Sequence, residues 1–190
     1  DLPGNYVNQF NTTRILTTAF LNWNIIKGLN FRSNLGVTNG NSRNGYFTGA
    51  NSLERSLSTG SLSRVSNANG LDITWENILT YQKDFGKHNI GATVLTSYVK
   101  GTEDNSSASG TGQLLPGQSF YALQNNPANL AISSRYVSST LLSGAFRLNY
   151  NYAGKYLLTI TGRSDGSSVL SEENKWQFFP SVAAAWRISD

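Results

Sequence analysis

The sequence predicts an all-β fold, an antiparallel meander of about seven strands, for three reasons. Apolar and polar residues alternate with a period of two in seven segments, as they do when successive side chains of a strand point to opposite faces. Turn-forming residues bound the segments, and the links between them are alternately short and long. Only 14% of the 190 residues are charged, against about 25% in soluble domains, which indicates a weakly charged surface.

The first four strands are expected at residues 13–24, 29–39, 71–83 and 88–100. The first has an apolar face that contains Trp23, and the second, LNFRSNLGVTN, alternates cleanly. The third, LDITWENILTYQK, has only Ile78 out of phase, and the fourth, HNIGATVLTSYVK, is weakened by Leu95 and Val99. All four fit strands that have one apolar face.

The last three strands are expected at residues 139–152, 156–165 and 175–188. STLLSGAFRLNYNY and YLLTITGRSD each set aromatic and aliphatic residues against Ser, Arg, Asn and Thr. In the last strand, FFPSVAAAWRIS, the even positions are wholly apolar and include Val182 and Trp186, whereas the odd positions include Ser181 and Arg187. We therefore expect the even face to lie against apolar surroundings.

Hairpin lengths agree with this assignment, because residues paired across a hairpin must share a face. A three-residue loop pairs Tyr152 with Tyr156, and a four-residue loop, 84–87, pairs Tyr81 with Ile90. In both hairpins the apolar face meets the apolar face.

Short and long links are expected at opposite ends of the sheet. The short links are 25–28, 84–87 and 153–155, and the long ones are 40–70, 101–138 and 166–174. Short turns on one rim and long loops on the other are typical of transmembrane β-barrels. A soluble β-sandwich that binds carbohydrate through exposed Trp and Tyr is the alternative.

The two faces of a barrel strand predict two sets of residues. On the apolar face, the aromatic residues expected to form a girdle at the membrane boundary are Trp23, Tyr81, Tyr150, Tyr156 and Trp186. The residues expected to face the lumen are Arg32, Arg147, Arg163, Asp165 and Arg187, because an arginine facing lipid near the midplane costs about 2 to 4 kcal/mol.

Several classes of function are excluded or disfavoured. The 15 Lys and Arg residues occur one at a time instead of forming a stripe, which argues against nucleic-acid binding. There is no cysteine, and the single histidine, His88, flanks a turn. Neither a phosphate loop nor a pair of catalytic carboxylates nor metal-ligand spacing is present, so we expect no enzyme, catalytic residue, cofactor or metal site. The acidic pairs at 103–104 and 172–173 are interpreted as solvated loop residues instead of calcium ligands.

The segment KYLLTITGRSDGSSVLSEENKWQFFPSVAAAWRIS resembles the barrel signature of SusC/RagA-type TonB-dependent outer-membrane transporters of Bacteroidota. The positions that match the R-x-D-G-S-S and W-x-x-F-P-S-x-x-x-x-W-R-I patterns are Arg163, Asp165, Gly166, Ser167, Ser168, Trp176, Phe179, Pro180, Ser181, Trp186, Arg187 and Ile188. Residues 24–36 and 75–81 are similar in a looser way, so the resemblance covers nearly the whole chain.

This resemblance implies that residues 1–190 are part of the barrel domain of a transporter of about 22 strands, plugged by a globular domain. The plug, the segment that engages TonB and the C-terminal barrel strands are expected to lie outside this chain. The family imports glycans or peptides with a SusD-like surface lipoprotein, and the intact parent chain would meet that lipoprotein, the TonB complex and outer-membrane lipid.

The resemblance leaves open the partners of the lumen-facing arginines and of segment 101–138. The lumen-facing arginines would contact plug carboxylates or substrate, or else pair with wall acids such as Asp72, Glu76 or Asp165. The long segment 101–138 is too apolar, at Phe120 and Tyr121 among others, to stay free in water. It would meet the lipoprotein or the substrate, or fold back on the barrel mouth.

Overall fold

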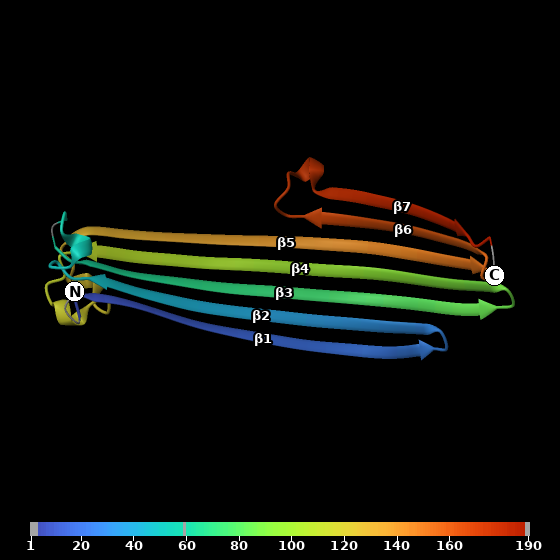
Figure 1. The fold of residues 1–190 in the computed structure, drawn as a ribbon, viewed down its shortest axis with the longest axis horizontal. Helices are drawn as coiled ribbons and strands as arrows, with labels where there is room; N and C mark the ends of the chain where they lie inside the picture. The colour runs from blue at the N-terminus through green and yellow to red at the C-terminus, as the bar shows by residue number, and fades with distance from the viewer. Residues whose placement is uncertain (1–3, 59, 189–190) are drawn as a thin grey trace. The chain divides into compact units, whose positions relative to one another are not determined.

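The structure, a computed structural model, describes residues 4–58 and 60–188 and consists mainly of β-strands. The strands are β1 (Tyr6–Ile26), β2 (Leu29–Thr48), β3 (Leu62–Phe85), β4 (His88–Thr111), β5 (Ala128–Tyr152), β6 (Tyr156–Ser167) and β7 (Trp176–Trp186). They form one sheet in chain order, so each strand lies beside its neighbours in the sequence (Figure 1). The predicted seven-stranded meander is confirmed, and the alternative of two packed sheets in a sandwich is wrong.

Short 3-10 helices lie in the longer links: η1 (Leu53–Arg55), η2 (Pro116–Gln118), η3 (Leu123–Asn125) and η4 (Glu172–Asn174). Within residues 4–58 and 60–188, no helix has the length and apolar character that crossing a bilayer would take.

The strands β1 to β5 are much longer than predicted, so two predicted loops are wrong in extent. The loop predicted at 40–70 is reduced to 49–61, and the loop predicted at 101–138 is reduced to 112–127. The segment added to β5, ANLAISSRYVS, still alternates, with Leu130, Ile132 and Tyr136 on one face. The segments added to β3 and β4, such as GTEDNSSASGT, carry mainly polar residues on both faces. Such segments have no apolar-polar alternation to reveal them, although their backbone groups pair as in any other strand.

Two of the three tight turns are shorter than predicted. β1 ends at Ile26 and β2 begins at Leu29, so the turn predicted at 25–28 is reduced to 27–28. β3 ends at Phe85 and β4 begins at His88, so the turn has two residues instead of four. The rings of Phe85 and His88 stack with centroids 5.4 Å apart, and the side-chain amide of Asn89 donates to the carboxylate of Asp84. Because the register moves by two residues, the same faces still meet.

The first turn, between β1 and β2, requires glycine at position 28. The φ of Gly28 is +85°, and a Cβ at this position would lie 2.2 Å from the carbonyl oxygen of Gln82. The backbone N–H of Gln82 donates to the carbonyl of Gly28 at 2.8 Å. The turn therefore needs a residue that adopts a left-handed conformation and lets β3 approach closely, and only glycine does both.

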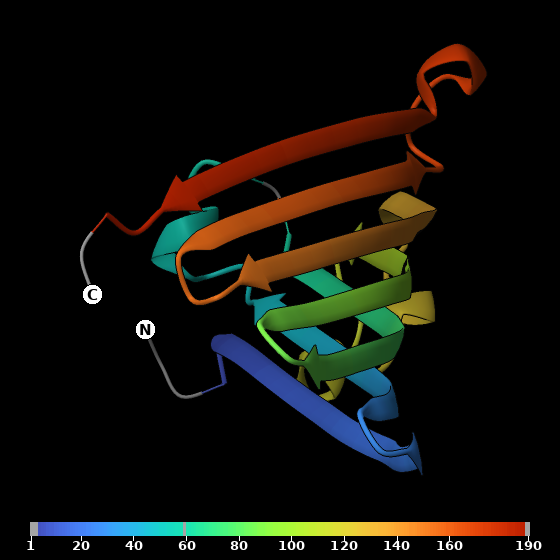
Figure 2. The same ribbon diagram turned by 90° about the vertical axis from the view of Figure 1, so that its right-hand side faces the viewer.

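The register of the last three strands confirms the predicted faces. Tyr152 pairs with Tyr156 across the β5–β6 turn, as predicted, and Tyr156 pairs in turn with Trp186. Figure 2 shows β6 (orange) beside β7 (red), with the link that contains η4 at one end of the pair. Apolar residues consequently continue across all three strands on one face.

The chain divides into two compact units, which are described separately. The loop unit comprises residues 1–15, 38–71 and 102–138, and the turn unit comprises residues 16–37, 72–101 and 139–190. The buried apolar side chains, Phe47, Phe120 and Ala122, all belong to the loop unit. The described residues of the turn unit bury no apolar side chain, and Val182 and Trp186 are 68% and 62% exposed. The turn unit thus has an exposed apolar face, of a kind that a soluble domain would bury.

Candidate functional site

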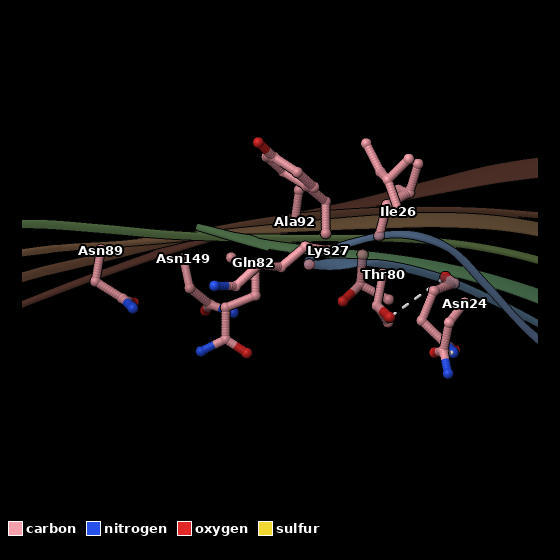
Figure 3. A pocket seen from close by; sticks show the side chains of 14 residues that line it. Asn24, Ile26, Lys27, Thr80, Gln82, Asn89, Ala92 and Asn149 are labelled. Carbon is pink, nitrogen blue, oxygen red and sulfur yellow. Dashed lines mark hydrogen bonds between the residues drawn. The ribbon is translucent and has the colours of Figure 1, made fainter. Parts of the chain in front are cut away.

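The polar face of the turn unit holds a depression of about 720 Å³ lined by carboxamides and hydroxyls. Figure 3 shows Asn24, Thr80, Gln82, Asn89 and Asn149 on one side of the strands, with Ile26 and Ala92 on the other. These polar side chains come from β1, β3, β4 and β5 and share a side because of strand alternation. The depression therefore offers many neutral donors and acceptors side by side.

Few of the polar groups in the depression are tied to each other. The amide of Asn30 donates to Asn24 Oδ1 at 2.6 Å, and the hydroxyl of Thr80 donates to the carbonyl of Asn30 at 3.4 Å. Lys27, from the first turn, is the cation among the lining residues. The hydroxyl or amide groups of a bound molecule could form hydrogen bonds with these side chains. Lys27 would be the one charged side chain among the described lining residues that it meets.

Arg163 and Asp165 form the clearest charged pair of the polar face. Arg163 Nε donates to both carboxylate oxygens of Asp165, at 2.9 and 2.8 Å, and Nη2 donates to the buried hydroxyl of Ser143 at 3.3 Å. The register places Ser143 directly opposite Asp165. For Arg163 the geometry therefore favours pairing within the wall over contact with a substrate.

Of the other predicted lumen arginines, Arg147 lies near this pair, whereas Arg32 and Arg187 have other partners. Arg32 donates from Nε to Asn34 Oδ1 at 2.8 Å, and its guanidinium lies 5.5 Å from the centre of the Phe20 ring. Arg147 lines a second depression of about 370 Å³, next to Arg163. The backbone of Arg187 follows β7 and donates to the carbonyl of Lys155 at 2.8 Å. The structure thus brings Arg147 close to Arg163 and gives Arg32 and Arg187 separate surroundings.

On the apolar face, aromatic rings form a continuous row along the short-turn rim. The centroid distances along the row are 5.4 Å from Phe85 to His88, 4.9 Å from His88 to Tyr152, 6.3 Å from Tyr152 to Tyr156 and 6.2 Å from Tyr156 to Trp186. These separations are typical of interacting ring pairs. We call these five residues the ring row.

Of the predicted girdle residues, Tyr156 and Trp186 belong to the ring row. Tyr150 joins it through a 2.7 Å hydrogen bond between its hydroxyl and His88 Nδ1. Trp23 and Tyr81 lie near the corresponding ends of β1 and β3. That these rings sit at a lipid boundary stays a prediction.

His88 is one of the ring-row residues that the predicted girdle does not include. The sequence predicts only that it flanks a turn, yet the rings of Phe85, Tyr150 and Tyr152 all contact it. The signal in the sequence is its parity: His88 shares the alternation of Ile90 on the apolar face of β4.

The indole N–H of Trp75, on the same apolar face, has a hydrogen-bond partner on that face. The indole N–H of Trp75 donates to the hydroxyl of Ser33 at 3.0 Å. Trp75 is half exposed, so without this partner its N–H would meet apolar surroundings in a bilayer.

In the loop unit, segment 112–127 packs on its own sheet. Phe120 is 2% exposed, and its ring lies over Gly45, where a Cβ would come within 2.2 Å of it. Gln113 holds the segment closed: its side-chain amide donates to the carbonyls of Ser119 and Ala122, at 3.1 and 2.9 Å. Of the two predicted contact residues, Phe120 is therefore part of the core.

Tyr121, the next residue, faces outward and is 65% exposed. Its hydroxyl donates to Gln9 Oε1 at 2.9 Å, and the guanidinium of Arg43 lies 5.8 Å from its ring centre. Tyr121 is held in place yet remains accessible to a partner.

The loop 49–61 is anchored by a separate contact. The hydroxyl of Tyr46 donates to the carboxylate of Glu54 in η1. Burial, followed by this hydrogen bond, raises the pKa of Tyr46, so the phenol stays protonated and keeps donating at neutral pH.

Acidic residues do not gather into a metal site in residues 4–58 and 60–188, where no group of three or more His, Cys, Asp or Glu occurs. Glu172 instead pairs with Lys175 at 3.2 Å.

Comparison with known proteins gives consistent matches of sequence. No known protein-family profile matches the chain. The chain is 34% identical over 168 residues, 88% of its length, to TonB-dependent receptor P3 of Formosa agariphila. It is 40% identical to TonB-dependent receptor P26 of the same organism over 60% of its length. It is also 40% identical to TonB-dependent receptor SusC of Bacteroides thetaiotaomicron over 39% of its length. The matches cover 17%, 12% and 8% of these proteins, so the chain spans less than a fifth of their length.

The fold matches solved structures as well. The RagAB peptide transporter superposes with a TM-score of 0.86 at 20% identity, over 95% of this chain and 20% of that one. The RagAB peptide importer in its "open-open" state gives a TM-score of 0.82 over the same shares. At this identity the likeness concerns the fold alone. The proteins that these comparisons name are receptors and transporters, not enzymes.

Proposed function

Because this chain belongs to the SusC/RagA type of TonB-dependent transporters, which are outer-membrane proteins of Bacteroidota, we propose that it forms part of the wall of a barrel that imports glycans or peptides. In this proposal a SusD-like surface lipoprotein covers the barrel, and a plug and a TonB-engaging segment belong to other parts of the full-length protein. The solved structures with the same fold are described as a peptide transporter and importer.

The observation that carries the proposal is the division of one sheet into an apolar and a polar face. Across β5, β6 and β7 the register brings Leu148 and Ile160 to one face with Val182. The same register brings Arg147 and Thr161 to the other face with Ser181. A sheet with an apolar face and a polar face, whose turn unit buries no apolar side chain among its described residues, fits a wall between lipid and a wet or plugged lumen.

Strand length supports the same arrangement. A transmembrane strand needs about 9 to 11 residues to cross the hydrocarbon layer. β6 and β7, with 12 and 11 residues, have about this length, whereas β3 and β4 have 24 residues each. More than half of β3 and β4 would therefore lie outside the hydrocarbon, which agrees with the small polar residues of their added segments.

The depression on the polar face favours neutral, hydrogen-bonding cargo. Carboxamides can donate to and accept from both the hydroxyls of sugars and the backbone amides of peptides. The depression therefore supports both substrate classes, and the choice between them belongs to the remaining parts of the transporter.

The proposal is tested by the surroundings of the two faces in the full-length protein. A nitroxide spin label is placed at Val182 or at the adjacent Ser181 in a background without other reactive cysteines, and the protein is reconstituted in lipid. We expect the label at Val182 to collide more with oxygen, which concentrates in lipid, and the label at Ser181 to collide more with a water-soluble nickel complex.

Leu158 and Thr159 on β6 serve as a second, matched pair, because they lie opposite Ala184 and Ala183 on the same two faces. Nickel accessibility at both Val182 and Leu158 would contradict a lipid-facing wall. For cargo, a strain that lacks the gene would be complemented and grown with either a polysaccharide or a peptide mixture as the limiting nutrient; complementation on neither would contradict import of these classes.

A further inference from the structure

The short-turn rim of the turn unit carries basic residues directly beside the ring row. Lys83 lies two residues before Phe85, Lys87 immediately before His88 and Lys155 immediately before Tyr156. We call these three lysines the outer lysines. Each therefore has a member of the ring row as its near neighbour in the sequence.

Backbone hydrogen bonds bring the turns that carry these lysines together. The N–H of Ala153 donates to the carbonyl of Lys87 at 2.6 Å, which joins the β3–β4 turn to the β5–β6 turn. The N–H of Arg187 donates to the carbonyl of Lys155 at 2.8 Å, which joins the β5–β6 turn to the residue that follows β7. The lysines consequently lie along one edge of the sheet, although they come from two different turns.

The acidic residue of this rim lies on the other face. Strand alternation puts Lys83 on the apolar face with Phe85 and puts Asp84 on the polar face. There the side-chain amide of Asn89 donates to Asp84. Among the described residues of the three tight turns and their flanks, the charges beside the ring row are thus all positive.

We propose that the outer lysines and the ring row together bind the headgroups of anionic phospholipids, such as phosphatidylglycerol. This inference rests on the proposed function, which sets the apolar face against lipid. In such barrels the short turns lie at the periplasmic boundary. Tyrosine and tryptophan rings prefer the headgroup level of a bilayer, and an ammonium group beside them attracts the phosphate. The rings lead directly into an apolar face that includes Val182, which fits the acyl chains of a lipid better than a soluble anion.

The test uses the full-length transporter in detergent, titrated with phosphatidylglycerol or with zwitterionic phosphatidylcholine, and counts bound lipids by native mass spectrometry. The double variant K83Q/K87Q removes two charges beside the ring row. Its matched control, K27Q/R187Q, removes two charges from the same rim but on the polar side, where Lys27 lines the depression.

We expect the wild type and the control to bind more phosphatidylglycerol than phosphatidylcholine. The outer-lysine variant should lose at least roughly threefold of this preference, since each basic group near an anionic surface contributes severalfold in affinity. Equal binding of the two lipids by the wild type would overturn the proposal. An equal loss in both double variants would also overturn it, because net charge alone would then explain the attraction.

Three controls accompany this test. A heat-modifiable band on gels shows whether each variant keeps its barrel, and K83R/K87R, which restores the charge, must keep the preference. Raising the salt from about 50 to 500 mM should weaken the preference of the wild type by screening. If the spin labels report lipid at Val182 while no preference for phosphatidylglycerol is seen, only this inference fails; if they report water there, the proposed function fails first.

Discussion

His88 Nδ1 and the hydroxyl of Tyr150 lie 2.7 Å apart and join β4 to β5 on the apolar face. The two rings are also close, with centroids 5.9 Å apart. A polar pair of this kind satisfies both partners where water is scarce, and it fixes the imidazole among the rings of Phe85 and Tyr152.

We predict that Tyr150→Phe lowers the free energy of unfolding by about 0.5 to 1.5 kcal/mol, because it leaves His88 Nδ1 without this partner while keeping the ring. The measurement is urea-induced unfolding of the full-length protein in lipid vesicles. Tyr156→Phe is the control, since that ring contacts Tyr152 and Trp186 by stacking. An equal loss in both variants would show that the hydrogen bond to His88 contributes nothing of its own.

Gly28→Ala should destabilise the turn unit by more than about 2 kcal/mol, because a left-handed conformation and a backbone clash both oppose the added methyl group. Gly86→Ala is the matched control: its φ is +60°, but a Cβ there meets nothing within 4 Å. We expect Gly86→Ala to cost only about 1 kcal/mol. If the two substitutions cost the same in urea unfolding, the close approach to Gln82 is not what requires glycine at position 28.

Gly45→Ala should open segment 112–127, because the new methyl group would occupy the place of the Phe120 ring. Limited proteolysis of intact cells should then cut this segment faster than in the wild type. Gly40→Ala, in the same strand, has free space around its Cβ and should leave the rate unchanged. An unchanged rate for Gly45→Ala would mean that Phe120 does not hold the segment.

Cysteines at Phe120 and Tyr121 should react very differently with a membrane-impermeant thiol reagent on cells, since the native side chains are 2% and 65% exposed. We expect rapid labelling at Tyr121→Cys and slow labelling at Phe120→Cys. Coexpression of the lipoprotein protects Tyr121→Cys if this surface is the lipoprotein interface. Labelling that ignores the lipoprotein would assign Tyr121 to the rim of the mouth alone.

Asp165→Asn should weaken the pair with Arg163 while keeping the shape of the side chain. Both groups are partly exposed, with side-chain exposures of 24% for Asp165 and 48% for Arg163, so we expect a loss of less than about 1 kcal/mol in stability, shrinking at high salt. Uptake by cells should be nearly normal if the pair belongs to the wall. A severe loss of uptake with normal stability would instead give Arg163 a role in contact with substrate or plug.

Side-chain alternation predicts the part of the fold in which the two faces of the sheet have different surroundings. Alternation located the segments that form β6 and β7, and it located the parts of β1 to β5 that lie toward the short turns. Parity alone set Tyr152 opposite Tyr156, the pairing that the β5–β6 register has, because a slip of one residue would send every apolar side chain to the wrong face. The family resemblance followed from the same C-terminal segments.

Contacts between distant parts of the chain set how far the strands extend, where segment 112–127 packs and which side chains surround His88. The segments added to β3 and β4 carry mainly Ser, Asn and Gly on both faces, so their pairing depends on backbone hydrogen bonds that leave no pattern in the side chains. Phe120 and Tyr121 are adjacent aromatic residues with the same apparent chemistry, and the gap above Gly45 is what buries one and leaves the other exposed. His88 acquires its role from rings that follow it by 62 and 64 positions in the chain, and contacts of that range form only when β4 and β5 pair.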